Sequence, residues 1–320
     1  MSKKFSYTIG FDLGGTKLAA ALTRSDGRIL DYRKIPVKMK LENSSSATQK
    51  RIVRTIADVA IEFRNSFPQY CSGSKFKGIG LASAGPLNVE SGVLIHPVNF
   101  PGWKTVPIKK LVERALVQRG FKTNLFFQND AMAAAFAEGW IGKAQKLKSY
   151  AVITIGTGIG SGIIVNGVPC QTSGAGSEFG HSIIDVKSLM QSPSKLSDFT
   201  VEGISSATGL IRRAQSLGFK GSSVEELIES KQYSYLFEEM ACALAVLCFN
   251  LSIGFNLEAI FLSGGLIKIK DLYFRSTKNF YKMLIKQFNP MFSCSIQVAK
   301  TKSKAGVIGA AYLPYIDQKK

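Results

Sequence analysis

Two glycine-rich segments have the residue types and spacing of phosphate-binding turns. The first, residues 10–17, reads GFDLGGTK and follows an apolar stretch. Glycines in such a turn let backbone N–H groups approach phosphate oxygens. The segment is not a P-loop, because Thr16 precedes Lys17, and it continues as a strand where a dinucleotide fingerprint would open a helix. A plain hairpin would not need Asp12, two glycines and Thr16 together, so a phosphate site is favoured.

The second segment, residues 156–162, reads GTGIGSG and repeats the design of the first. Residues 7–22 (YTIGFDLGGTKLAAAL) and 151–165 (AVITIGTGIGSGIIV) both show an apolar strand, a glycine-rich turn with a hydroxyl residue, and a second apolar strand. Alone, the second segment is a weak signal. The likeness indicates an internal duplication at the scale of a domain, and two such hairpins could hold one nucleotide from both sides.

An acidic residue, Asp130, is the candidate general base. It ends the sequence Gln128-Asn129-Asp130, between a short apolar strand and an alanine-rich helix. A carboxylate at the carboxyl edge of a strand is well placed to point into a cleft. Asp130 could instead cap the helix that follows, and the residues alone support the two interpretations equally.

Two more segments offer polar or flat surfaces. Residues 176–181, GSEFGH, place Glu178 and His181 three apart in a chain with two histidines, and Glu202 follows in the sequence VEG. A site for a polar ligand is at least as well supported here as a structural histidine. Residues 262–266, LSGGL, end an apolar strand with two glycines, which suits the approach of a flat base but is a weak signal alone.

Strands and helices alternate around these motifs in two similar halves. This alternation predicts two α/β domains with a cleft between them. We expect strands at 5–11, 18–23, 29–37, 79–82, 125–127, 259–262 and 295–298, strand pairs within 151–165, and helices after Ser44–Ser46 and at 131–140, 234–255 and 305–315.

Composition limits the class of protein. The chain has 320 residues and a formal charge of 41 − 22 = +19, but its cations are spread along the sequence without a basic run, so we expect no nucleic-acid partner. No apolar run reaches the length of a membrane span, and the N-terminus lacks a signal peptide, so we expect a cytoplasmic protein without membrane contact. The five scattered cysteines, which form no C-x-x-C pair, predict free thiols.

Taken together and in order, these segments resemble the ROK family of sugar kinases and related repressors, within the actin-like, hexokinase-like ATPase superfamily. The resemblance extends over nearly the whole chain and includes two further segments, SAGP at 83–86 and HPVN at 96–99 with Gly102-Trp103. It implies an α/β fold of two ribonuclease H-like domains with the active-site cleft between them. The smaller domain would span 1–128 and the larger 129–320, with the final helix, about 304–316, able to pack back on the smaller one.

The resemblance also implies a role for each motif. Asp130 would accept the proton of the attacking sugar hydroxyl, and Asp12 would hold Mg²⁺, through water. The hexose would be bound by Asn99, Asn129, Asp130, Glu178, His181 and Glu202. ATP would be bound by Asp12, Gly14, Gly15, Thr16, Lys17, Thr157, Gly158, Gly264 and Gly265.

One departure from the family concerns zinc. Many members carry a C-x-C-G-x-x-G-C cluster after the E-x-G-H loop, whereas the matching stretch here, Asp185 to Phe199, has no cysteine. We therefore expect ATP and Mg²⁺ as ligands and no zinc.

The expected activity is transfer of the γ-phosphoryl group of ATP to a hexose, with glucose and its 6-hydroxyl as first choice, which would place the protein in carbohydrate metabolism and glycolysis. Kinases for N-acetylmannosamine, N-acetylglucosamine or fructose are the alternatives. A sugar-sensing regulator is less favoured, because only six residues precede the first phosphate-binding segment, residues 7–22, where family repressors carry a DNA-binding module. An actin-type structural protein would not need Glu178 and His181. We expect a homodimer.

Overall fold

The computed structural model of the chain describes residues 5–37, 44–171, 177–191 and 199–316. Their contacts separate two compact units: unit 1 comprises residues 1–145, 171–176 and 304–320, and unit 2 comprises 146–170 and 177–303. The domain limits expected from the sequence, 1–128 and 129–320, stay a prediction, because compact units need not coincide with the domains of a family.

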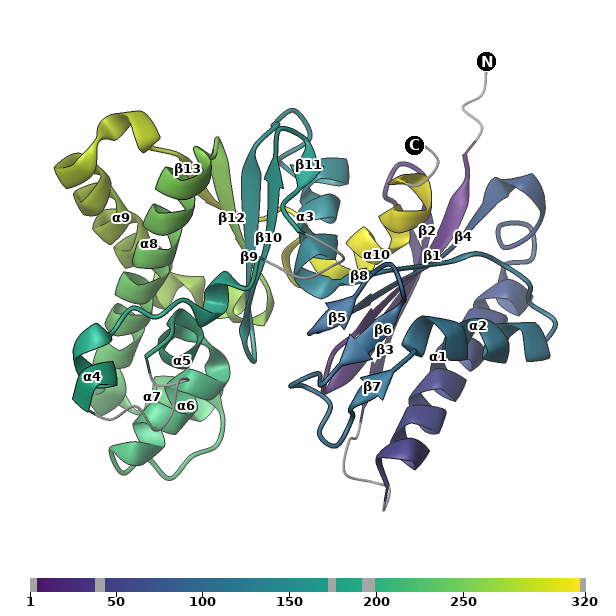
Figure 1. The fold of residues 1–320 in the computed structure, drawn as a ribbon, viewed down its shortest axis with the longest axis horizontal. Helices are drawn as coiled ribbons and strands as arrows, with labels where there is room; N and C mark the ends of the chain where they lie inside the picture. Colours follow the sequence, from purple (N-terminus) through teal and green to yellow (C-terminus); the bar gives the residue numbers. More distant parts are fainter. Residues whose placement is uncertain (1–4, 38–43, 172–176, 192–198, 317–320) are drawn as a thin grey trace. The chain divides into compact units, whose positions relative to one another are not determined.

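Unit 1 combines a five-stranded sheet with helices on both of its faces (Figure 1). Its elements are β1 (Tyr7–Leu13), β2 (Lys17–Arg24), β3 (Ile29–Pro36), α1 (Ser45–Ser66), η1 (Gly73–Lys75), β4 (Phe76–Ser83), β5 (Leu87–Asn88), β6 (Val93–Ile95), β7 (Thr105–Val106), α2 (Ile108–Gln118), β8 (Leu125–Asn129), α3 (Asp130–Ile141) and α10 (Ala305–Ile316).

Unit 2 is built around a second five-stranded sheet, with the long helix α8 beside α9 (Figure 1). Its elements are β9 (Tyr150–Ile155), β10 (Ile159–Val165), β11 (Val168–Pro169), η2 (Phe179–His181), α4 (Val186–Gln191), α5 (Val201–Ser205), α6 (Ala207–Ser216), α7 (Val224–Glu229), η4 (Lys231–Tyr233), α8 (Tyr235–Phe255), β12 (Ala259–Ser263), η5 (Gly265–Leu272), α9 (Phe274–Phe288), η6 (Pro290–Phe292) and β13 (Ser295–Val298).

The two sheets have the same topology. The order is β3-β2-β1-β4-β8 in unit 1 and β11-β10-β9-β12-β13 in unit 2. In each sheet the first three strands pair antiparallel and the last two join in parallel. The duplication predicted from the glycine-rich segments is therefore confirmed, since β1–β2 and β9–β10 are equivalent hairpins.

The two faces of the sheet in unit 1 differ in the size of their side chains. One face carries large apolar residues such as Ile9 and Phe11, which share a buried core with Ile52 and Ile56 of α1. The other face is covered by α3 and α10 and is built from alanine and glycine. Alternation along the strands separates the two sets.

Helix α10 lies against its neighbours at backbone distance. A Cβ atom added at Gly80 of β4 would lie 1.8 Å from the carbonyl oxygen of Ala310, and one added at Gly309 would lie 1.7 Å from that of Ala133 in α3. Neither position has room for a side chain. These glycines fix α10 on β4 and α3.

The most apolar helix of unit 2 belongs to its core. Residues 231–255, which include α8, are long and apolar enough to cross a membrane by length and composition, the one such case among the described residues. Their most apolar window is 61% buried, and core helices meet the same test. Leu244, Leu247 and Leu251 of α8 are fully buried beside β9 and β12. This packing confirms the buried helix predicted at 234–255.

Candidate active site

The carboxyl ends of three parallel strands bring the candidate acidic residues of unit 1 to one edge. Leu13, Ser83 and Asn129 are paired in register at the ends of β1, β4 and β8. Asp12 is the residue before Leu13, and Asp130 follows Asn129 as the first residue of α3. The predicted position of Asp130, between a strand and a helix, is confirmed. Such an edge is where α/β sheets bind ligands.

Asp12 and Asp130 lie close enough to affect each other's ionisation. Burial, together with the charge of Asp130, raises the pKa of Asp12 to about 7, while the nearby Lys17 opposes the shift. Burial also raises the pKa of Asp130, against a hydrogen bond from the backbone N–H of Ala131. We call Asp12, Lys17, Asn129 and Asp130 the Asp12 cluster.

Asn129, rather than Asp130, is the N-cap of α3. Its Oδ1 atom accepts hydrogen bonds from the N–H groups of Ala131, at 2.9 Å, and Met132, at 3.1 Å. Within the part of the chain that the structure describes, the Nδ2 group of Asn129 makes no hydrogen bond. Asp130 occupies the first helical position, where its Oδ1 accepts from the Ala131 N–H at 2.8 Å. The capping role considered for Asp130 therefore belongs mainly to its neighbour.

The glycine turn between β1 and β2 packs on the loop that carries Asn99. The Gly14 N–H donates to the carbonyl oxygen of Lys17 at 2.9 Å, which closes the turn. A Cβ added at Gly15 would lie 2.6 Å from the carbonyl oxygen of Asn99. Thr16 and the side chain of Asn99 are exposed. Two motifs that lie more than eighty residues apart in the sequence are thus neighbours.

No motif predicted that the N-terminus of α10 would contact Asp12. A Cβ added at Gly306 would lie 2.4 Å from Asp12 Oδ2, so the carboxylate rests against the first turn of α10. The positive end of a helix dipole favours a carboxylate there. Residues 305–311, AGVIGAA, are mostly small, which indicates a close helix contact. The sequence does not indicate which strand this segment packs against.

The raised pKa of Asp12 predicts how stability depends on pH. The folded chain binds more protons than the unfolded chain between the ordinary aspartate pKa of 3.8 and about 7. Stability should therefore fall as the pH rises through this window. We expect Asp12→Asn to melt at a higher temperature than the wild type at about pH 8, and the difference to shrink towards about pH 4. Thermal unfolding without divalent cations measures this.

Asp26→Asn is the control for this experiment. A hydrogen bond from Arg24 lowers the pKa of Asp26 to about 2, so its ionised form stabilises the fold above the ordinary pKa. Removing that carboxylate should not raise the melting temperature at about pH 8. A melting difference between Asp12→Asn and the wild type that stays constant with pH would mean that Asp12 titrates in the ordinary range.

In unit 2, Glu202 holds the second glycine turn. Its Oε2 atom accepts a hydrogen bond from the Ile159 N–H at 2.7 Å, and a Cβ added at Gly158 would lie 2.4 Å from the same atom. The Gly156 N–H donates to the carbonyl oxygen of Gly158 at 2.9 Å. Thr157, at the tip, is exposed. Glu202, Thr157 and Gly158, predicted separately, are therefore close together, and we call them the Glu202 cluster.

Helix α6 supports the same turn, a feature that the motifs did not indicate. The N–H of Ala207 donates to the carbonyl oxygen of Gly156 at 2.8 Å. Ser206 caps α6, because its side chain accepts from the Gly209 N–H at 3.0 Å. The serine at the start of α6 is a helix-cap residue that the sequence pattern could have predicted. The hydrogen bond from α6 to a turn fifty residues earlier could not be predicted from any local pattern.

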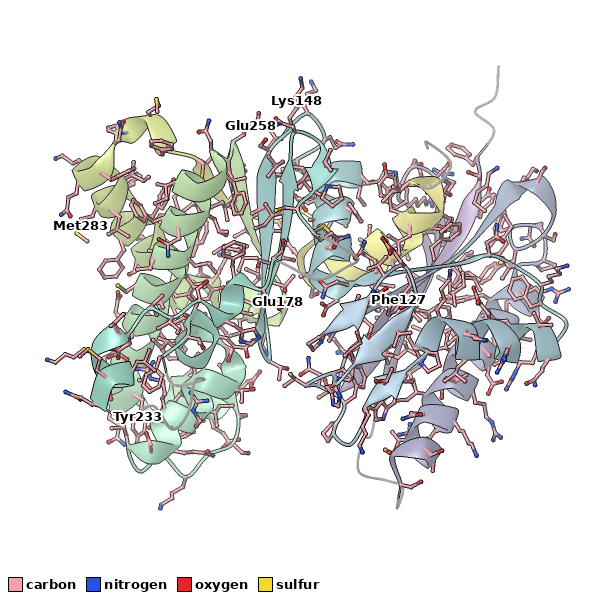
Figure 2. All side chains as sticks on the ribbon, viewed as in Figure 1. Phe127, Lys148, Glu178, Tyr233, Glu258 and Met283 are labelled. Atoms are coloured by element: carbon pink, nitrogen blue, oxygen red, sulfur yellow. The ribbon has the colours of Figure 1, made fainter. Side chains whose placement is uncertain are left out.

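The loop with Glu178 and His181 is fixed on β10. The Oγ atom of Ser161 donates to the carbonyl oxygen of Ser177 and accepts from the Phe179 N–H, the latter at 3.3 Å. Glu178 and His181 are exposed, and Figure 2 shows Glu178 beside the β9–β10 hairpin. Gly176, at the start of the predicted segment, lies outside the described residues.

The two glycines after β12 differ in their surroundings. Gly264 has φ +94°, and a Cβ there would lie 2.4 Å from the carbonyl oxygen of Ile155 at the end of β9. Gly265 has no heavy atom within 4 Å of its Cβ position. Gly264 is therefore required by packing, and Gly265 offers the open backbone surface that the motif predicted.

Backbone pairing joins the two ends of the stretch in which we expect no zinc cluster. Ile183 and Thr200 form an isolated antiparallel bridge, and the Ile184 N–H donates to the carbonyl oxygen of Phe199 at 2.8 Å. Residues 192–198 lie outside the described part. Among the described residues, no three histidine, cysteine or acidic side chains are grouped as metal ligands.

A sequence model of the ROK family matches residues 8–315. The chain belongs to the ROK family. It is 27% identical to a glucokinase of Thermotoga maritima, with 95% of each chain covered. It is also 26% identical to an N-acetylmannosamine kinase of Haemophilus influenzae, with 95% of this chain and 94% of the relative covered. The crystal structure of a ROK hexokinase from Thermus thermophilus superposes with a TM-score of 0.78 at 26% identity, covering 98% of this chain and 99% of the other.

Proposed function

We propose that this ROK protein is an ATP-dependent kinase that transfers the γ-phosphoryl group of ATP to a hexose hydroxyl. The observation that carries the proposal is the pair of carboxylates Asp12 and Asp130 beside the Gly14-Gly15 turn, at the carboxyl edge of a sheet. A base next to a phosphate-binding turn is what phosphoryl transfer to a hydroxyl requires. Relatives named glucokinase and N-acetylmannosamine kinase support the same class.

Asp130 is the base in this proposal. Its position at the first turn of α3 keeps the carboxylate oriented, and its raised pKa brings it nearer to the pH at which the reaction runs. It would accept the proton of the sugar hydroxyl as the oxygen attacks phosphorus. The free Nδ2 group of Asn129 is a donor for a neighbouring sugar hydroxyl.

Asp12 suits a hydrated magnesium ion. Mg²⁺ prefers carboxylate oxygens and keeps several waters. A cation held by Asp12 would offset the charge of Asp130, which now contributes to the raised pKa of Asp12. When bound, the ion would neutralise charge on the phosphate oxygens. Lys17 adds a second positive charge on the Asp12 side.

Unit 2 supplies the remaining polar groups of the proposal. The tip residues Thr157 and Gly158 would bind phosphate oxygens, and Gly265 would border the adenosine with Gly264 behind it. Glu178, His181 and Glu202 would bind the hexose. The equivalent strand order of the two sheets supports two ribonuclease H-like domains.

A panel of sugars tests the class and the substrate together. With ATP and Mg²⁺, we expect the specificity constant for ADP release to be highest with glucose. The reason is that Glu178, His181 and Glu202 would hydrogen-bond the hydroxyls near C1 to C3. An acetamido group needs extra space beside C2. N-acetylmannosamine, N-acetylglucosamine and fructose are the comparison sugars. A higher specificity constant for an acetamido sugar would change the substrate, and ADP release with none of them would reject the kinase.

The contact between Gly15 and Asn99 predicts coupled effects on the two ligands. We expect Gly15→Ala to weaken the binding of both ATP and sugar, because its Cβ would displace the Asn99 backbone. Gly254→Ala, near the end of α8, is the control, since no heavy atom lies within 4 Å of its Cβ position and the residue belongs to neither proposed ligand site. Calorimetry with each ligand alone measures both. Loss of ATP binding with sugar affinity intact would mean that Asn99 does not contact the sugar.

The assembly and the location of the protein stay predictions. A homodimer and a cytoplasmic location fit a kinase of free sugars and ATP. Sedimentation of the purified chain tests the dimer.

A further inference from the structure

A concave surface lies in unit 1, at the ends of β4 and β8 opposite to the edge where Asp12 and Asp130 lie. It is a groove of about 780 Å³. It lies where β4 begins, at Phe76, and where the chain enters β8, at Asn124. Its volume falls within the range of small-molecule sites. The proposed kinase activity makes no use of it.

The groove is lined by more cations than acids. Arg64, Lys77 and Lys122 line it together with one carboxylate, Glu113. The ammonium groups of Lys77 and Lys122 make no hydrogen bond or ion pair within the described residues, and Glu113 lies 3.8 Å from the ammonium group of Lys109. The two lysines are therefore available to an anion.

Arg64 is held in place and joined to an apolar floor. Its Nη1 atom donates to the carbonyl oxygen of Gly120 at 2.7 Å, and its guanidinium lies 5.0 Å from the ring centroid of Phe121. Phe121 stacks on Phe76 with 5.6 Å between the ring centroids. Both rings line the groove. A ligand there would meet positive charge and aromatic surface together.

A β-bulge accounts for the position of Lys77. Successive residues of a strand point to opposite faces, yet Phe76 and Lys77 both line the groove. The register between β1 and β4 shifts here, because Tyr7 faces Phe76 whereas Ile9 faces Ile79. Gly78 takes φ +127°, and a Cβ there would lie 2.9 Å from the carbonyl oxygen of Asn124. Bulges of this kind re-aim a side chain.

We propose that this groove binds a small organic phosphate. Lys77, Lys122 and Arg64 would contact the phosphate group, and the Phe76–Phe121 pair would contact its apolar or planar part. Lysine and arginine are the usual partners of phosphate oxygens, and a groove open to solvent with one opposing carboxylate suits a ligand held reversibly. The site is separate from the Asp12 cluster, so it can be occupied while the proposed active site works.

Site-resolved lysine reactivity tests the proposal on the full chain. The protein is acetylated briefly in rising concentrations of phenyl phosphate, or of orthophosphate at matched ionic strength, and mass spectrometry follows each lysine. We expect Lys77 and Lys122 to be protected at concentrations that leave Lys75 and Lys110 reactive. Those two lie in the same unit outside the groove and are exposed. Phenyl phosphate should act at lower concentration, because its ring meets the aromatic floor.

Two double variants provide the second readout. Phenyl phosphate should raise the melting temperature of the wild type. In the double variant Lys77→Gln with Lys122→Gln, about ten times more phenyl phosphate or more should be needed for the same rise in melting temperature. The double variant Lys75→Gln with Lys110→Gln should respond like the wild type. If the substitution of Lys77, which lies in β4, impairs folding, Lys122→Gln alone tests the site, because Lys122 lies in an exposed loop. Equal protection of all four lysines, or equal melting shifts in both double variants, would overturn the site. If orthophosphate protected the lysines at the same concentration as phenyl phosphate, the proposal of an organic phosphate would be wrong, and free phosphate would be the ligand.

Discussion

Asp130→Asn should lower the turnover number by roughly 10²–10⁴-fold, the loss expected when a general base is removed. An amide of the same shape cannot take the proton of the sugar hydroxyl. The melting temperature should stay near that of the wild type, because the N-cap of α3 is Asn129 and its two hydrogen bonds are untouched. Sugar affinity measured without nucleotide should also remain.

Two further variants separate catalysis from capping. Asn129→Ala removes the cap and should cost roughly 0.5–2 kcal/mol of stability. Glu90→Gln removes an exposed carboxylate from the same unit and should change neither rate nor stability. Near-normal turnover in Asp130→Asn would remove this residue from the mechanism and leave the proposed site without its base.

Gly309→Ala should be the most damaging single-carbon change for the fold. The added Cβ would lie 1.7 Å from the carbonyl oxygen of Ala133, so α10 must move away from α3. Overpacking of this kind typically costs about 1–3 kcal/mol and sometimes more, which outweighs the roughly 1 kcal/mol that alanine gains over glycine in a helix. We expect a clear fall in the melting temperature of unit 1.

Tryptophan fluorescence can follow this unit selectively. The chain has two tryptophans, Trp103 and Trp140, and both belong to unit 1. Trp140 stacks on Tyr312 of α10 with 4.8 Å between the ring centroids, so its emission reports the docking of that helix.

Gly254→Ala is the matched control. It is also a helical glycine, at the end of α8, and no heavy atom lies within 4 Å of its Cβ position. This variant should be as stable as the wild type or up to about 1 kcal/mol more stable. If Gly309→Ala and Gly254→Ala melted alike, the close packing of α10 would not matter for stability.

Local signals in the sequence predicted most elements correctly. The strands expected at 18–23 and 29–37 and the helix after Ser44 follow from local patterns alone, and Ser44 does cap α1 by accepting from the Ala47 N–H. The first strand is two residues later than expected, at Tyr7–Leu13, because Asp12 reads as polar although it pairs with β2 and β4.

Other features depend on contacts that no local pattern contains. Helix α9, Phe274–Phe288, was not expected, and neither was the small sheet of β5, β6 and β7. The bond from Ile159 to Glu202 joins residues 43 positions apart. The raised pKa of Asp12 depends on Asp130, which is far away in the sequence. Motifs identified the residues, but only the fold gives their neighbours and therefore their charge.

The position of α10 has a consequence for synthesis of the chain. Unit 1 needs residues 305–316 to cover the small-residue face of its sheet, although the rest of its sheet and helices lie within residues 5–141. While a ribosome is still translating the second half, α10 is not yet made, and the sheet surface around Gly10 and Gly80 that it covers stays exposed. Domains usually fold in the order in which they are made. Here the first sheet to be translated must wait for the last helix, so the nascent chain carries an unfinished unit until all of unit 2 has emerged.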